Sequence, residues 1–235
     1  MANANNRKQF DRYYTEAEEK KLFKLLKNTD CVFAKRDLAW MQFLRFTGIR
    51  IGVLGGKVLK DANKRKAGTD VALTLQEAQE KGNVGKLLGL TVGEAKNAIK
   101  TGYLTVRPDI TKTNSAGHTY MAKAAKAALT ELLKIRKKMG HPENADEQLI
   151  IGKKNNGLSI RQFQERFSYW ANLAGLAGSP HWMRHTMAKR IIKNSTATDP
   201  MGIVQNILDH NSINSTTVYT APDKEDIALA MEQIC

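Results

Sequence analysis

The sequence predicts a mainly α-helical fold with one small antiparallel β-hairpin. Several segments of the 235-residue chain carry apolar residues at helical spacing, whereas residues 103–120 carry β-branched residues and a polar turn. Hydrophobic residues make up 42% and charged residues 26% of the chain, as in ordinary globular proteins. This composition excludes a chain that is disordered throughout.

The expected elements follow in chain order. Ser179 and Pro180 mark the clearest helix start, because serine is a preferred N-cap and proline fits the first helical position. A polar turn over 114–117 separates a strand over 103–111 from a second short strand. Helices are expected over 15–28, 36–46, 74–80, 92–100, 121–138, 160–174, 180–193, 200–209 and 224–235.

The charge of the chain favours a polyanionic partner. The formal net charge is +14 and the sequence pI is about 9.8, and lysine or arginine that neutralises a phosphate releases condensed counterions. A generically basic protein remains the alternative on charge alone. The residues after Tyr219 are mainly acidic, which indicates that this tail does not lie on DNA. The candidate DNA-binding residues are Lys57, Lys60, Lys64, Arg65, Lys66 and Lys123.

Cysteine usage and hydropathy indicate the cellular compartment in which the protein is expected. Cys31 and Cys235 provide neither a disulfide framework nor a metal-ligand spacing. No apolar run is long enough to span a bilayer, and the polar start of the chain lacks a signal-peptide core. A reducing cytoplasm is expected.

Three side chains on the helix that begins at Pro180 form a candidate anion site. His181, Arg184 and His185 stand at positions i, i+3 and i+4, so they share one face. Arginine offers a rigid fork of donors for phosphate oxygens, and histidine can also move protons. A zinc pair made by the two histidines is disfavoured, because Arg184 between them would repel a cation. A surface histidine pair with no function is the remaining alternative.

Five motifs in one order extend this patch into a recognisable set. They are Thr47-Gly48-Ile49-Arg50, Thr111-Lys112-Thr113, His181-x-x-Arg184-His185, Leu208-x-His210, and Tyr219 nine residues after His210. Together they resemble the signature of the tyrosine recombinase (phage integrase) family. Each motif alone is weak, but the ordered set spans nearly the whole chain.

The resemblance implies the catalytic-domain fold of that family and a site-specific recombinase that cleaves and rejoins duplex DNA. It implies that Tyr219 attacks a backbone phosphorus and forms a 3′-phosphotyrosyl link. Arg50 and Arg184 would bind the non-bridging phosphate oxygens, where charge gathers in the transition state. Lys112 would protonate the departing 5′-oxygen. No cofactor is implied, because the new ester conserves the energy of the broken phosphodiester.

The resemblance also assigns the histidines and the assembly. His181 would accept the tyrosine proton, His210 would donate to a phosphate oxygen, and His185 would brace the helix. Double-stranded DNA is the implied partner, and a homo-oligomer, a tetramer on DNA, is the implied assembly. Bacterial or phage origin is expected.

The expected domain organisation has three parts. Residues 1–12 are expected to be a flexible arm, 13–222 the catalytic domain with an insertion of uncertain structure at 61–99, and 223–235 a tail helix. The amino-terminal DNA-clamping domain common in the family is expected to be missing, either naturally or through truncation.

Two positions depart from the family pattern. Val53 stands where an acidic residue usually follows the first arginine, and Asp209 replaces the glycine usual before the last histidine. A carboxylate there would oppose phosphate binding unless it points away. These departures motivate a second hypothesis, a non-catalytic DNA-binding relative such as an excision factor. A relaxing enzyme that resembles type IB topoisomerases is a third.

Overall fold

The computed structural model describes residues 12–59, 72–73, 85–87, 89–110, 116–152, 156–210, 212–222 and 224–234. Its helices are α1 (Glu16–Asn28), α2 (Val32–Thr47), α3 (Ile51–Gly55), α5 (Val92–Thr101), α6 (Lys123–Lys138), α7 (Ile160–Leu173), α8 (Pro180–Asn194), α9 (Pro200–Ile207) and α10 (Lys224–Glu232). Its strands are β1 (Lys57–Leu59), β2 (Ala72–Leu73), β3 (Gly85–Leu87), β4 (Tyr103–Val106) and β5 (Gly117–Tyr120). Short 3-10 turns occupy Pro108–Ile110, Ile213–Ser215 and Thr217–Tyr219. The predicted mainly α-helical fold is confirmed.

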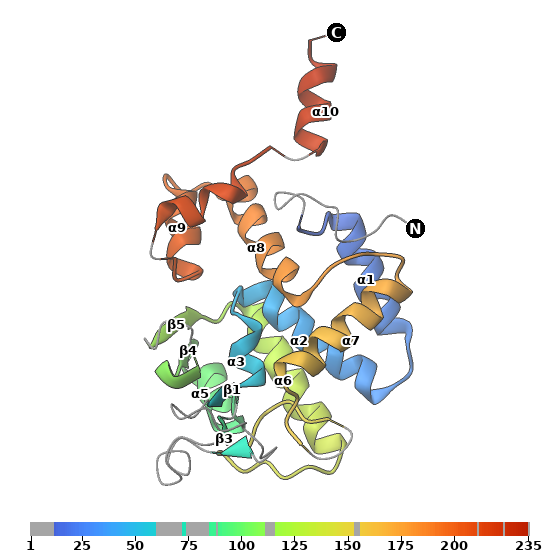
Figure 1. Ribbon diagram of the computed structural model, residues 1–235, viewed down its shortest axis with the longest axis vertical. Coiled ribbons are helices and arrows are strands. Elements are labelled where there is room, and N and C mark those ends of the chain that lie inside the picture. Colours follow the sequence, from blue (N-terminus) through green and yellow to red (C-terminus); the bar gives the residue numbers. More distant parts are fainter. Residues whose placement is uncertain are drawn as a thin grey trace.

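Helix α2 forms the centre of the core and packs mainly against α6 and α8 (Figure 1). Trp40 and Phe43 are fully buried on it, and the Trp40 ring meets Phe163 of α7 edge to face at 5.0 Å. The predicted start at residue 36 was late, because the helix begins at Val32, where the half-buried Val32 side chain packs against the core. A helix buried on most of its surface shows little amphipathic pattern to mark its start.

A buried carboxylate joins α2 to α7. Asp37 is fully buried and accepts hydrogen bonds on one oxygen from Arg36 and from the Trp40 indole at 3.0 Å. The other oxygen accepts from Arg166 and from the Trp170 indole at 2.8 Å. Both oxygens of the buried carboxylate therefore accept hydrogen bonds, and this polar cluster holds α2 against α7 within the core.

The predicted hairpin is present, with β4 antiparallel to β5 and Tyr103 opposite Tyr120. Its first strand is shorter than the predicted 103–111, ending at Val106, because a 3-10 turn starts at Pro108. Proline has no backbone N–H to donate to a strand ladder. The predicted turn over 114–117 lies mostly outside the described residues.

Sequence patterns missed a second, three-stranded sheet within residues 57–87. Strand β3 pairs antiparallel with β1 and parallel with β2. Such short strands leave almost no alternation to detect. The predicted helix over 74–80 lies outside the described residues. The helix predicted over 92–100 is confirmed as α5, with a capping box between Thr91 and Glu94.

Helices α8, α9 and α10 form the end of the molecule shown at the top of Figure 1, where α10 extends away from the body. Pro180 takes the first helical position of α8 as predicted, but the Ser179 side chain makes no capping hydrogen bond. A separate small core joins α8 to α9 and contains Met187, Val204 and Tyr219. Within the described residues, no helix is both long and apolar enough to cross a membrane.

Candidate active site

The predicted anion patch lies on one face of α8. The rings of His181 and His185 meet edge to face with their centroids 4.4 Å apart. Met183 and Met187 point away from this patch into the two cores. The helix therefore carries the polar patch on one side and anchors itself with the other.

Arg184 is the structural centre of the site. The residue is 4% exposed, and its guanidinium donates to the backbone carbonyls of Gly48 and Leu208. Gly48 caps α2 with φ 65°, and a Cβ there would lie 2.0 Å from the end of the Met187 side chain, so glycine is favoured at this position. Arg184 thus ties the end of α2 to the end of α9.

This tie brings Arg50 beside Arg184. Arg50 is half-buried and precedes α3 as its N-cap residue. Its charge lowers the pKa of Arg184, but burial is the larger cause of a pKa of about 10. Arg184 therefore still carries its charge at neutral pH. Val53 is buried in the core, and no described residue forms a hydrogen bond or ion pair with the Arg50 guanidinium.

Tyr219 lies against the same arginines. Its side chain is 5% exposed, and its ring lies 5.1 Å from the His185 ring and is stacked at 6.2 Å on the His210 ring. Burial raises the pKa of Tyr219, while the charges of Arg184 and Arg50 and a hydrogen bond with Arg184 lower it. Because burial prevails, the phenol is neutral at pH 7 and needs a base before it can attack.

His210 is held in place on two sides. Its Nδ1 lies 2.9 Å from the Thr216 hydroxyl, and its backbone N–H donates to Gln205. Burial and the charges of Arg184 and Arg50 lower its pKa. The ring is therefore mostly neutral at pH 7, with one N–H to donate.

The two α8 histidines are neutral at pH 7. Burial and the charge of Arg184 lower the pKa of His181 to about 4, and burial and the charge of His181 lower that of His185 to about 3. His181 is exposed, and the charges of Arg184 and Arg50 act on its ring. A neutral, accessible imidazole can accept a proton.

Arg12 is a site residue that sequence reasoning missed. Its charge contributes to the lowered pKa of both His181 and His185. The segment that carries it is fixed to α8, because the Tyr14 N–H donates to the Thr186 hydroxyl at 2.9 Å. No motif marks Arg12, since this contact joins residues far apart in the chain.

A cleft of about 470 Å³ opens beside the arginines. Arg50, His181, Arg184 and Asp209 line it, and Thr119 of β5 contributes to its wall. Its position next to two guanidiniums suits an anion such as a DNA phosphate. Tyr219 lines a second cavity, of about 340 Å³, between α8 and the amino-terminal segment. Tyr219 also forms a hydrogen bond with Arg184, which lines the cleft.

Of the remaining predicted site residues, only Lys57 and Lys123 lie within the described part of the chain. Lys60, Lys64, Arg65, Lys66 and Lys112 lie outside the described residues. Lys57 begins β1, and Lys123 is exposed at the start of α6. Among the residues whose positions are described, no group of three or more His, Cys, Asp or Glu side chains could hold a metal ion.

The lowered histidine pKa values predict a pH-dependent stability. Between pH of about 4 and 6.5, His181 and His185 bind protons in the unfolded chain and not in the folded protein. The free energy of unfolding should therefore rise with pH through this window and level off above it. Urea denaturation across the window measures the slope. His185→Gln should flatten it, whereas His118→Gln on the exposed face of β5 should not; equal slopes in all three proteins would contradict the prediction.

The model of the phage integrase family matches residues 83–226. The tyrosine recombinase XerC of Histophilus somni is 32% identical over 106 residues, which cover 44% of this chain and 34% of that protein. XerC of Chromohalobacter salexigens is 31% identical over 125 residues, covering 52% and 40%. The match thus spans little more than a third of the length of these relatives.

Solved structures share the fold. The crystal structure of XerA recombinase has a TM-score of 0.61 at 17% identity and covers 97% of this chain and 65% of that one. The Tn1549 transposon integrase in complex with circular intermediate DNA has a TM-score of 0.58 at 15% identity, covering 98% and 69%. The chain therefore has the predicted tyrosine-recombinase catalytic-domain fold.

Proposed function

Since this chain belongs to the phage integrase family, we propose that it is a site-specific DNA recombinase with Tyr219 as its nucleophile. One observation carries the proposal: the only phenol of the ordered motif set lies against Arg184, His185 and His210, with the charge of Arg50 acting on it. Transfer of a phosphoryl group to a tyrosine needs a base for the phenol and cations for the phosphate oxygens. These residues supply both, although they lie far apart in the sequence.

In the proposed step, the Tyr219 oxygen bonds to a backbone phosphorus and the bond from phosphorus to the 5′-oxygen breaks. The phenolic proton goes to His181, which is neutral at pH 7 and accessible. The departing 5′-oxygen takes a proton from Lys112. Attack by a 5′-hydroxyl on the phosphotyrosine reverses these transfers and rejoins the strand, so no cofactor is consumed.

The arginines and remaining histidines stabilise the transition state. Arg50 and Arg184 bind the two non-bridging oxygens in the cleft, and preorganised cations there supply a large catalytic term. His210 donates a hydrogen bond to a phosphate oxygen. His185 contacts the rings of both His181 and Tyr219, which suits a bracing role.

Double-stranded DNA is the proposed substrate, and a tetramer on DNA is the proposed assembly. The net charge of +14 supports the first, with Lys57, Lys123 and the basic residues over 60–66 as backbone contacts. The second is supported by α10, which extends from the body with Ile227 and Met231 exposed and could reach a second subunit.

A suicide substrate tests the proposal. A duplex from the DNA beside the gene, nicked so that the fragment with the 5′-hydroxyl diffuses away, should trap a covalent protein–DNA adduct. Tyr219→Phe should abolish the adduct, and Tyr103→Phe on the exposed hairpin should not. Equal trapping by Tyr219→Phe refutes the assignment. Salt-sensitive binding without any adduct favours the non-catalytic alternative, and relaxation of a plasmid without a target site favours the topoisomerase alternative. The mass of the trapped complexes tests for four chains.

A further inference from the structure

An aspartate lines the same cleft as the two arginines. Asp209 contributes to the wall that Arg50 and Arg184 also form. Its charge acts on this wall, because it raises the pKa of Arg184 and of His210 against the stronger influences that lower them. Among the described residues, none donates a hydrogen bond or forms an ion pair with this carboxylate. Within the described part of the chain, its charge is therefore not held in an ion pair.

The backbone alone does not explain an aspartate here. Asp209 follows the end of α9 with φ 51°, the one positive φ of a non-glycine residue in the described part of the chain. The Asp209 N–H donates to Asn206 and the His210 N–H to Gln205, which closes the helix end. Glycine fits this conformation best, and asparagine fits it as well as aspartate. What aspartate adds at this position is its charge.

We propose that Asp209 weakens phosphate binding in the cleft, so that strand cleavage depends on additional contacts along the DNA. The inference rests on the proposed recombinase function. A phosphate between Arg50 and Arg184 meets a like charge, and because Asp209 is exposed this repulsion weakens as the salt concentration rises.

The opposing benefit of Asp209 is small. A carboxylate can help by keeping its neighbours protonated, but Arg184, with a pKa of about 10, is charged at neutral pH in any case. The pKa of His210 stays lowered despite Asp209, because burial and two arginines outweigh it. Repulsion of the phosphate is therefore the larger effect, and it falls equally on target and non-target DNA. Only DNA that is held by further contacts overcomes it.

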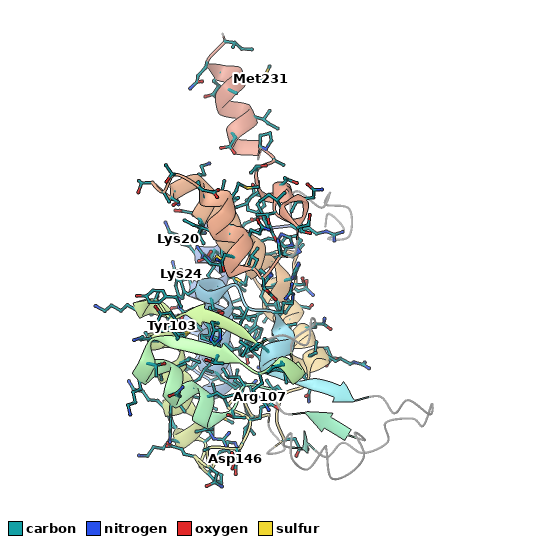
Figure 2. The ribbon with its side chains drawn as sticks, turned by 90° about the vertical axis from the view of Figure 1, so that its left-hand side faces the viewer. Lys20, Lys24, Tyr103, Arg107, Asp146 and Met231 are labelled. Atoms are coloured by element: carbon teal, nitrogen blue, oxygen red, sulfur yellow. The ribbon has the colours of Figure 1, made fainter. Side chains whose placement is uncertain are left out.

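Binding and cleavage test this role separately. In the Tyr219→Phe background, Asp209→Asn and Asp209→Gly should each bind a short duplex of arbitrary sequence about three- to tenfold more tightly at low salt, with a smaller gain at high salt. In the otherwise unchanged chain, both should form the suicide-substrate adduct faster by a similar factor. Asp146→Asn is the matched control, because Asp146 is exposed at the opposite end of the body from α9 (Figure 2).

Each outcome decides the role of Asp209. Tighter binding and faster adduct formation by both Asp209 variants, absent from Asp146→Asn, support the inference. Unchanged or weaker binding, slower adduct formation, or a gain that Asp146→Asn shares overturns it. If the unchanged chain traps no adduct at all, the recombinase proposal fails, whereas the binding comparison still decides whether Asp209 repels phosphate.

Discussion

Arg184→Lys is expected to slow adduct formation on the suicide substrate about a hundredfold or more. Arg184 holds the carbonyls of Gly48 and Leu208 and also bonds to Tyr219. A single ammonium cannot reach these partners and a phosphate oxygen together. Lysine keeps the charge, so the loss would come from the geometry of the guanidinium.

Arg190→Lys is the matched control on the same helix. Arg190 forms one ion pair, at 2.8 Å, with Glu19, which lysine can keep. Adduct formation by Arg190→Lys should therefore stay within about twofold of the unchanged chain. Circular dichroism confirms that both variants are folded. Wild-type rates in Arg184→Lys would show that a point charge is sufficient, and the proposed phosphate clamp would be wrong.

Asp37→Asn should give the largest loss of stability, about 3–5 kcal/mol in the free energy of unfolding. The substitution leaves the guanidiniums of Arg36 and Arg166 without their carboxylate, and Arg36 is almost fully buried. The new amide N–H₂ group would also face one of the two indole donors, on Trp40 or Trp170. An uncompensated charge and an unpaired donor in the core both cost free energy.

Urea denaturation measures this loss, with Asp30→Asn as the control. Asp30 pairs with Lys35 at 3.0 Å on the surface, where its side chain is 99% exposed. Loss of such an exposed pair has little effect on stability, because water and salt screen it. A similar small effect of Asp37→Asn would mean that the cluster does not hold α2 against α7.

The sequence predicted the site best where the chemistry is local. His181, Arg184 and His185 share a face because helical spacing requires it, and the two histidine rings do meet on α8. Predictions failed where local signals are weak. The strand that begins at Tyr103 was predicted to continue past Pro108, where the structure has a 3-10 turn. The short strands over 57–87 were missed because two or three residues are too few to show an alternating pattern.

For Asp209, the sequence and the structure each supply part of the argument. The sequence identified it as a departure from the family pattern, but could not say whether its carboxylate faces the phosphate site. The structure places Asp209 in the wall of the cleft with a positive φ. Substitution by asparagine or glycine removes the charge and keeps a residue that can adopt this φ, so the effect of the charge can be measured by itself.

By itself, the sequence determined the residue chemistry: a mainly helical chain, a strong positive charge, and arginine, histidine and tyrosine motifs in one order. Only the tertiary structure decided their environments. In the folded protein the pKa values of His181 and His185 are lowered, and the charges of Arg12 and Arg50 act on His181 of α8. The Tyr219 ring contacts the rings of His185 and His210. The reason is physical, because burial and neighbouring charge set a pKa, and both depend on contacts between residues that are far apart in the chain.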